Sequence, residues 1–569
     1  MYLRTTSRRR KDGSSVTYFQ LAENEWDAEQ GRSVTRIIHN FGRAEPDTVE
    51  SLRRLAGSIL RGIDESGLAT DKDGKPLASL KLNDAWRFGG VWVLEQIWKQ
   101  LGIDKVLQQH ARSLESAQVF ERAIFTMVAN RALQPYSKLY CWQQWIKNEV
   151  YLPSSTELSL HHLYLAMDFL EEHKTKVEEA IFFAMADLMN ADVDLIFYDT
   201  TSLHFEVDTE DVADAHRGDK HYEAARKRGH SKNGRTDAPQ IVVGLAVTRE
   251  GLPVRSWVFP GNTGDVTTVE RVKKELSGWR LGRCVFVGDA GMNSEENRRK
   301  LALGGGKYIL ASRMKSGDEV TTDVVTRAGR YRNVADNLRV KEVFVGDGER
   351  RRRYVVCHNP DEEKRQHLHR EQVLVDLEAE LASLKQQRGA RHSKRACELR
   401  TSGRFGRYLR ETRGGLLRID RAAVKDAARY DGKWVITSND DTLTAEDLAL
   451  GYKQLMRVEE CWRDLKSGLR MRPVYHWRSW RIHAHVTLTV FALLLERIAE
   501  IRGGDTWRNL RAELEAIKVI EYEHAGTRVW QTTELKPATA ALLKRLQIPN
   551  PQKIHGLEPL EDAGQQAES

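Results

Sequence analysis

The sequence predicts an α/β protein in which a mixed-sheet core is interrupted by an insertion domain and preceded by a mostly helical region. Three observations support this fold class. Apolar residues recur at helical spacing over 81–189, and short apolar strands alternate with turns and helices over 190–320. This regularity stops at about residue 321 and resumes at 433 with a strand and long helices. A chain of 569 residues has room for three or four such folding units.

The N-terminal part, residues 1–80, is expected to be rich in strands. Residues 15–21 and 34–40 are both β-prone, and the second stretch runs into a turn. Residues 81–189 follow as a helical scaffold and a candidate DNA-binding domain. The helical spacing is carried by Val91, Leu94, Ile97, Trp98 and Leu101, and later by Val177, Ala180, Ile181, Ala184 and Leu188.

The first part of the core, residues 190–320, has the pattern of three strands followed by two helix–strand units. In that order, the first and fourth strands can lie side by side in one mixed sheet. Ser294 can cap the second helix, because two glutamates follow it in the first turn. Strands are expected at residues 193–198, 240–247, 254–259, 284–287 and 308–311, and the first helix at 267–276.

Residues 321–432 are interpreted as a basic insertion domain. An amphipathic helix inside it is marked by Leu374, Leu377, Leu381 and Leu384. Residues 385–429 hold fourteen basic and four acidic residues, an excess of ten, whereas the whole chain has an excess of eight. Smaller basic clusters lie at 216–235 and 350–353. One such run is usually a solvated surface, but three suit a surface that binds DNA phosphates.

The second part of the core, residues 433–545, begins with a strand at 434–438. A long helix is expected from Thr444, where the pattern is close to a capping box, to about Gly468. Residues 482–501 are apolar enough for a buried helix. The last residues, 546–569, are expected to be a polar tail.

Composition excludes several classes of protein. Apolar residues make up 40% and charged residues 30%, as in globular proteins. The longest apolar run, residues 486–495, is far shorter than the ~20 residues of a membrane span, so no membrane partner is expected. No secretory signal follows Met1, and the five cysteines include no C-x-x-C pair. We therefore expect a cytoplasmic protein without a disulfide framework or zinc site.

Two aspartates stand at the predicted ends of apolar strands. Asp199 lies in Phe-Tyr-Asp-Thr-Thr-Ser, and Asp289 lies in Val-Gly-Asp-Ala-Gly. Neighbouring strand ends could bring both carboxylates onto one cation, since burying them unpaired would be costly. Taken singly, each aspartate is explained equally well by ordinary turn chemistry.

Glu459, on the predicted long helix, is the third candidate. It shares a helix face with Tyr452 and Lys466, because a seven-residue spacing drifts only about 20° per heptad. The alternative is a surface ion pair between Glu459 and Arg463, one turn later. Two aspartates and a glutamate suit two hard divalent cations about 3.5–4 Å apart, which can promote an in-line phosphoryl displacement.

Asp199, Asp289 and Glu459, with the Tyr452…Glu459…Lys466 spacing, resemble the DDE transposases of bacterial insertion sequences. The similar branch has the signature Tyr-x2-Arg-x3-Glu-x6-Lys and carries its insertion between the second Asp and the Glu, as here. The likeness covers most of residues 190–500, with further similar stretches at 229–240, 259–265 and 472–476. It implies an RNase H-like catalytic core that cuts DNA at the ends of the element and joins the freed 3′-OH to target DNA.

By this resemblance, the three acidic residues would bind Mg²⁺ or Mn²⁺, as two ions. Tyr452 and Lys466 would hold DNA phosphates near the cut. Leu455 occupies the Arg position of the signature, so Arg457 or Lys453 would have to take over its phosphate contact. The remaining candidates for contacts with DNA are Arg463, Lys232 and Arg235.

The resemblance also implies the partners. They are the transposon ends and the target DNA, and synapsis of two ends implies a homodimer on DNA in the nucleoid. Two alternatives stay open: a catalytically inactive DNA-binding protein descended from a transposase, and an RNase H-like nuclease that does not join strands. Metal-dependent nicking would exclude the first, and joining of precut ends would exclude the second.

Two other motifs do not support a different enzyme. His483 and His485 resemble the histidine pair of single-strand nickases, but residues i and i+2 of a helix point to different sides. The glycine run before Lys307 is not a phosphate loop, because Leu301 stands where that loop needs a glycine.

Overall fold

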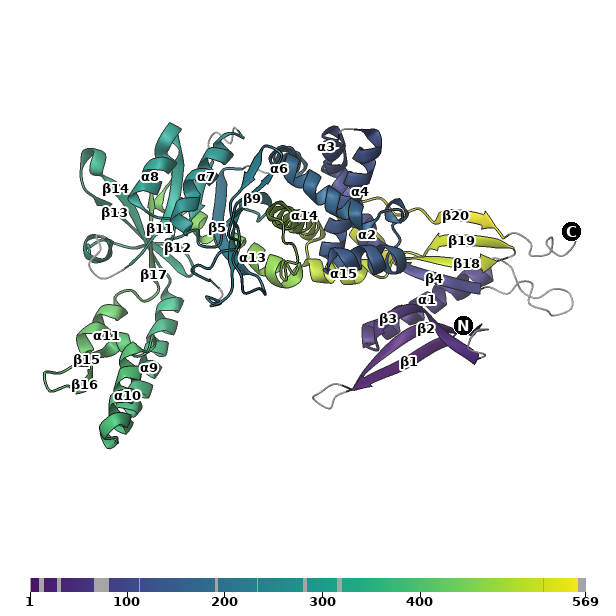
Figure 1. The fold of residues 1–569 in the computed structure, drawn as a ribbon. Coiled ribbons are helices and arrows are strands. Elements are labelled where there is room, and N and C mark those ends of the chain that lie inside the picture. Colours follow the sequence, from purple (N-terminus) through teal and green to yellow (C-terminus); the bar gives the residue numbers. More distant parts are fainter. Residues whose placement is uncertain are drawn as a thin grey trace, which may run out of the picture.

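The computed structural model describes residues 2–9, 15–27, 32–65, 81–111, 113–189, 193–232, 234–279, 284–314, 320–524 and 526–560. The molecule is elongated, with a large sheet at one end, a helical region in the middle and two smaller sheets at the other end (Figure 1). Of the regions predicted above, residues 66–80 and 561–569 lie outside the described residues.

The large sheet has nine strands in the order β12-β13-β14-β17-β11-β10-β5-β8-β9. β5 (Leu195–His204), β8 (Gln240–Val247) and β9 (Pro253–Pro260) form an antiparallel meander. β10 (Val285–Gly288) and β11 (Lys307–Ser312) run parallel to β5. The first and fourth strands of this region are therefore neighbours, as predicted. Helices α7 (Asp265–Ser277) and α8 (Glu295–Ala302) precede β10 and β11.

β5 is longer than predicted. It does not end at Asp199 but continues to His204, and all residues from Phe197 onward pair with β8. The physical reason is the β-branched pair Thr200 and Thr201, which favours an extended, half-buried strand. Asp199 therefore lies within a strand, and only its parallel neighbour β10 ends at that level.

Part of the predicted insertion extends the same sheet. β12 (Arg332–Ala335), β13 (Leu338–Val345) and β14 (Arg352–His358) join it through β17 (Lys433–Ser438). The following residues, 360–428, project away from the sheet and are called the arm below (Figure 1). The arm contains α9 (Pro360–Gln386), α10 (Gly389–Thr401), β15 (Leu409–Glu411), β16 (Leu417–Ile419) and α11 (Arg421–Ala428).

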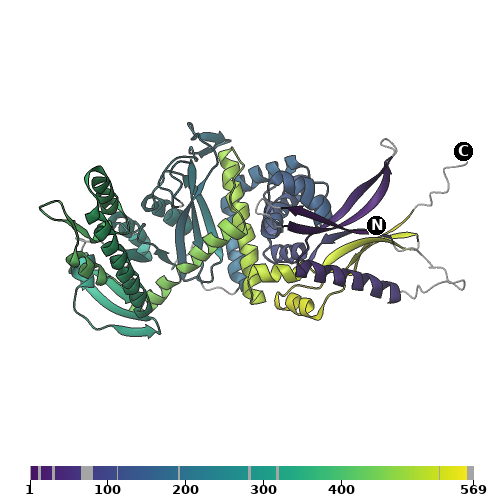
Figure 2. The same cartoon turned by 90° about the horizontal axis from the view of Figure 1, so that it is seen from below.

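The middle of the molecule is helical. It contains α2 (Gly89–Gln100), α3 (Ile103–Gln109), α4 (Leu114–Leu133), α5 (Lys138–Tyr140) and α6 (Leu160–Met189). The long helix α14 (Ser479–Gly503) packs on α2, α4 and α6 and on β9, so it lies between these helices and the sheet (Figure 2). Among the described residues, α14 is the one helix long and apolar enough to span a membrane. However, 89% of its apolar window is buried inside the protein, as in a core helix.

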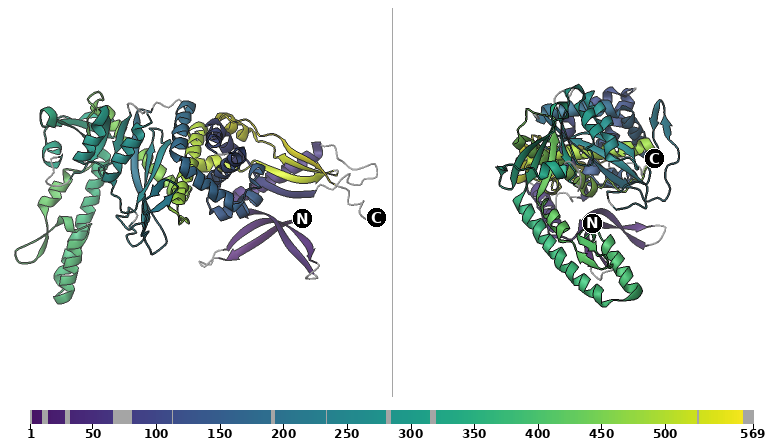
Figure 3. Two further views of the ribbon diagram at one scale, coloured as in Figure 1. Left: turned by 45° about the horizontal axis from the view of Figure 1, so that its top comes forward. Right: turned by 90° about the vertical axis from the view of Figure 1, so that its left-hand side faces the viewer.

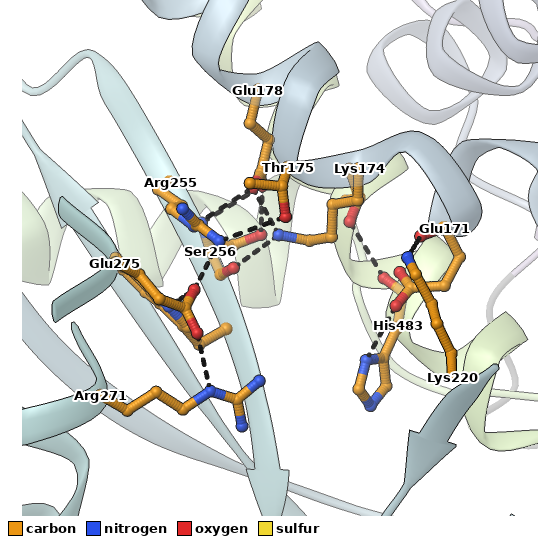
Figure 4. Close-up of polar contacts among 12 residues, drawn as sticks. Glu171, Lys174, Thr175, Glu178, Lys220, Arg255, Ser256, Arg271, Glu275 and His483 are labelled. Atoms are coloured by element: carbon orange, nitrogen blue, oxygen red, sulfur yellow. Dashed lines mark hydrogen bonds and ion pairs between the residues drawn. The ribbon is translucent and has the colours of Figure 1, made fainter. Parts of the chain in front are cut away.

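A buried polar network fixes this helical region against the edge of the sheet (Figure 4). Glu178 on α6 accepts hydrogen bonds from Lys174 (2.6 Å) and from the backbone N–H (3.3 Å) and hydroxyl (3.1 Å) of Ser256 on β9. Arg255, beside it on β9, pairs with Glu275 on α7. Because losing one partner would leave a buried charge uncompensated, the network holds α6, β9 and α7 in one arrangement.

Two small sheets lie at the far end. β1 (Tyr2–Arg9), β2 (Ser15–Asp27) and β3 (Arg32–Arg43) form an antiparallel sheet, followed by α1 (Pro46–Glu65), a helix that was not predicted. The second sheet joins an early and a late segment of the chain, because β4 (Lys81–Arg87) pairs with β18 (Lys518–His524).

The predicted polar tail contains a strand among its described residues. β19 (Thr527–Thr532) pairs with β20 (Ile554–Pro559), a strand inside the predicted tail. Backbone pairing with β19 gives the polar chain an ordered place that its composition does not indicate. α15 (Trp507–Leu514) and α16 (Pro537–Arg545) both pack on α14.

The predicted long helix is broken. α12 (Ala445–Lys453), begun by a Thr444–Asp447 capping box, is separated from α13 (Met456–Arg463) by a turn, and a π-helical turn follows at Asp464–Gly468. α12 packs on β11, β13, β14 and β17, whereas α13 packs on β5 and β8. One straight helix could not follow the twisted sheet across all these strands, so the break lets both segments bury their apolar side chains.

Candidate active site

The strand register brings two predicted carboxylates together. Val287 of β10 is paired with Phe197 of β5, and Asp289 and Asp199 each lie two residues further on. Neighbouring strands are about 4.8 Å apart and side chains two residues apart share a face, so both carboxylates reach the same face of the sheet. Asp289 also accepts hydrogen bonds from the backbone of Gly291, at 2.9 Å, so its predicted turn role exists as well.

All three predicted acidic residues line one open hollow of about 500 Å³. Glu459 reaches it from α13, and Lys466 reaches it from the following π-helical turn. The indole N–H of Trp462, also on α13, donates to the carboxylate of Asp199 at 3.1 Å. The lining consists of Asp199, Thr200, Thr201, Lys232, Asp265, Asp289, Gly291, Arg313, Glu459, Trp462 and Lys466.

The donor set suits a divalent metal that the substrate helps to bind. Within the described ranges, no three His, Cys, Asp or Glu side chains lie close enough together to hold a metal ion by themselves. Mg²⁺, however, is usually bound through one or two carboxylates together with waters and substrate phosphates. Asp199 and Asp289, with Glu459 on the same hollow, fit a site of that kind.

Burial changes the charge properties of this site. It raises the pKa of Asp199 to about 6, and the ammonium of Lys232 opposes that shift. Burial also raises the pKa of Asp289, again opposed by Lys232. It lowers the pKa of Lys466, and the charge of Arg472 lowers it further. Such perturbations in one hollow are typical of functional sites.

Asp265 and Trp462 are two of the lining residues that were not predicted as site residues. Asp265 begins α7 and forms an ion pair with Lys232 at 3.0 Å, and Trp462 contacts Asp199. Their contacts join segments far apart in the sequence. The one available signal was the resemblance at residues 259–265, which ends on Asp265.

The remaining predicted residues lie at different distances from the hollow. Burial is the main reason that the pKa of Tyr452 is raised, and the charges of the three carboxylates raise it further, so its phenol lies within their electrostatic reach. Arg463 is exposed and is not among the lining residues. Arg235 is paired with Asp237 at 2.9 Å.

The signature Arg position is part of the core. Leu455 is only 7% exposed and packs in the main hydrophobic cluster. Its two proposed substitutes, Lys453 and Arg457, line a separate cavity of about 1490 Å³ and not the hollow with the carboxylates. Arg457 is also paired with Glu460 at 2.9 Å.

The chain is similar to known transposases in two segments. Residues 199–495 match the family model described as transposase DDE domain, and residues 3–71 match that of the IS1634 family transposase, N-terminal domain. No curated protein matches. A cryo-EM structure of a piggyBac transposase synaptic complex with hairpin DNA matches 81% of this chain and 84% of its own, at 10% identity and a TM-score of 0.31. A likeness of that size supports no argument here.

Proposed function

We propose a reaction for this chain, which belongs to the transposase DDE domain family and is a DDE-type transposase. It cleaves the ends of an insertion sequence and joins the freed 3′-OH to target DNA. The observation that carries the proposal is the meeting of Asp199, Asp289 and Glu459 at one hollow, although they are far apart in the sequence. The neighbouring strands β9-β8-β5-β10-β11, three antiparallel and then two parallel, support an RNase H-like core.

The catalytic roles follow from the donor chemistry. Asp199, Asp289 and Glu459 would hold two Mg²⁺ or Mn²⁺ ions, which when bound supply activation of the attacking oxygen and stabilisation of the leaving oxygen. Lys466 lies on the same hollow, so its ammonium can hold a DNA phosphate beside the cut. Tyr452 does not line the hollow, and its contact with the same strand is proposed from the family resemblance alone.

Contacts with DNA further from the cut are assigned to exposed basic residues. Arg463 is exposed, Arg235 is half-exposed, and Arg457 lines the separate cavity. DNA held over the hollow would therefore meet positive charge on several sides. Because two ends must be joined in one reaction, we propose a homodimer on DNA, acting in the nucleoid of the cytoplasm.

The test is a cleavage and joining assay with DNA that carries the cognate ends. We expect Mg²⁺-dependent or Mn²⁺-dependent nicking, and joining when precut ends are supplied. Asp199→Asn, Asp289→Asn and Glu459→Gln should each lower cleavage at least about a thousandfold, because bound metals supply several kcal/mol and about 1.4 kcal/mol is tenfold.

Glu460→Gln is the matched control, since this neighbouring carboxylate pairs with Arg457 and does not line the hollow. Three variants that cleave like the wild type would contradict the assigned site. Nicking without joining of precut ends would indicate a nuclease, and DNA binding without any metal-dependent cleavage would indicate an inactive DNA-binding protein.

A further inference from the structure

The ammonium of Lys232 makes two hydrogen bonds and a close ion pair inside the protein. Its ammonium donates to the carbonyl oxygen of Thr200 at 2.8 Å and to the hydroxyl oxygen of Thr200 at 2.7 Å. The third partner is a carboxylate oxygen of Asp265 at 3.0 Å. Thr200 therefore accepts from two of the three donors of the lysine, and Asp265 neutralises its charge. The carboxylate of Asp199, at 3.8 Å, is an electrostatic neighbour outside hydrogen-bond distance.

Thr200 closes the arrangement into a ring. Its hydroxyl donates to the other carboxylate oxygen of Asp265 while it accepts from Lys232. Thr200 is 1% exposed and follows Asp199 directly on β5. Asp265 is the first residue of α7, where the helix N-terminus favours a negative charge. The ring thus ties β5, α7 and the loop that carries Lys232 together at the residue next to Asp199.

The backbone of Gly291 packs closely against the carboxylates of Asp289 and Asp265. A Cβ added at Gly291 would lie 3.1 Å from one carboxylate oxygen of Asp289 and 3.3 Å from one of Asp265. The glycine therefore lets these two carboxylates approach the same point of the backbone. Asp265 is consequently held within the hollow and cannot be regarded as a distant surface charge.

From this geometry we propose that Lys232 and Asp265 are a positioning pair for Asp199, and that Lys232 does not contact DNA phosphate. This inference rests on the proposed function and replaces the DNA-contact role expected for Lys232 from its basic cluster. Lys232 and Asp265 both bind Thr200 and so fix the backbone of β5 next to Asp199. This fixes the position of the Asp199 carboxylate in the hollow. A displacement of about 1 Å at a reacting group can cost about a hundredfold in rate.

The test combines cleavage kinetics with DNA binding. Lys232→Gln and Asp265→Asn should each slow cleavage about a hundredfold, and the double variant should be no slower than either, because both break one ring. The affinity for end DNA and its salt slope should not change. If Lys232 instead bound a phosphate, Lys232→Gln would reduce the slope by about 0.9 and Asp265→Asn would not mimic it. Additive losses in rate or a reduced slope would overturn the proposal.

Substitutions at Thr200 separate positioning from loss of folding. Thr200→Ser keeps the hydroxyl and should retain the wild-type cleavage rate, whereas Thr200→Val should behave like Asp265→Asn at an unchanged melting temperature. Equal rates for Ser and Val would contradict the ring. These variants keep the charge of both Lys232 and Asp265, so an effect cannot come from lost attraction to DNA.

Amide hydrogen exchange gives a readout that does not depend on activity. Exchange in the peptide that contains residues 199–204 should rise by the same factor in Lys232→Gln, Asp265→Asn and the double variant, because local opening of β5 becomes easier. Unchanged exchange would overturn the pair. If the wild type does not cleave end DNA, the proposed function fails; if it cleaves and Asp265→Asn cleaves equally, only the positioning role fails.

Discussion

At the scale of single residues, the buried His485 and the half-buried His476 lie at the segment that follows α13. The Nε2–H of His485 donates to the carbonyl oxygen of Met471 at 3.0 Å, and its Nδ1 lies 3.2 Å from the ammonium nitrogen of Lys138. The ring of His476 lies 5.5 Å from that of His485. Burial lowers the pKa of His476 to about 3 and that of His485 well below its usual value. Both side chains are therefore neutral in the folded protein near neutral pH.

This predicts that acid destabilises the fold. Between pH 6.5 and about 3 the unfolded chain binds a proton at His476 that the folded chain does not, so stability falls as the pH falls. His476 alone should account for about 2 kcal/mol between pH 7 and pH 5. Urea unfolding at both pH values should show this loss in the wild type and a smaller loss in His476→Gln. The exposed His161→Gln is the control, and identical pH slopes for wild type and His476→Gln would contradict the account.

At this scale the sequence predicted the acidic residues but not their partners. Asp199, Asp289 and Glu459 were predicted from expected strand ends and from spacing, together with the resemblance, although β5 continues past Asp199. Trp462 and Asp265 were missed because their contacts with Asp199 and Lys232 depend on which strands and helices become neighbours. No local pattern encodes a hydrogen bond between residues 263 positions apart.

At the scale of elements, the break between α12 and α13 decides what faces the hollow. α13 lies on β5 and β8, which brings Glu459 to the side of Asp199. Leu455, in the turn between the two helices, is buried in the core. The position that holds an arginine in the signature therefore has an apolar environment in this chain.

We predict that Leu455→Arg destabilises the protein by about 3 kcal/mol or more, because it places an unpaired charge in an apolar core. Leu455→Met keeps the volume and should cost less than about 1.5 kcal/mol. Denaturant unfolding of both variants measures the difference. An arginine variant that is as stable as the wild type and binds end DNA more tightly would show that position 455 faces DNA instead.

Strands and helices with a regular spacing of apolar residues were predicted well, and elements that depend on tertiary contacts were not. β8 occupies the predicted residues 240–247, and β9, β10, β11 and α7 lie within two residues of their predicted bounds. β12–β14 and β20 were missed, since pairing with distant strands stabilises them. The predicted single helix from Thr444 failed for the same reason, because the twist of the sheet breaks it.

At the scale of the whole molecule, two parts project from the same side. The arm and the β1–β3 sheet both extend below the long axis, and α13 lies between them along that axis (Figure 1, Figure 3). The arm also carries the largest local excess of basic charge. DNA bound along this side would meet the arm.

This arrangement predicts that the arm contributes to the salt dependence of DNA binding. Replacing the exposed Arg388, Arg391, Arg410 and Arg413 by Gln should flatten the dependence of log affinity on log salt by about 0.9 for each DNA phosphate that the variant no longer neutralises. Fluorescence anisotropy over a salt series measures it. Arg365→Gln and Arg395→Gln are controls, since these arm residues are paired with Glu362 and Glu380. An unchanged slope in the fourfold variant would place the arm outside the interface.

The central claim is that three acidic side chains, brought from separate segments, bind the divalent ions that cut DNA. The most direct measurement is anomalous diffraction from crystals of the protein with end DNA and Mn²⁺. We predict manganese peaks within about 2.5 Å of carboxylate oxygens of Asp199 and Asp289, with Glu459 ligating one ion and a DNA phosphate completing the site. Manganese bound elsewhere, or peaks that leave Glu459 out of reach, would contradict the account.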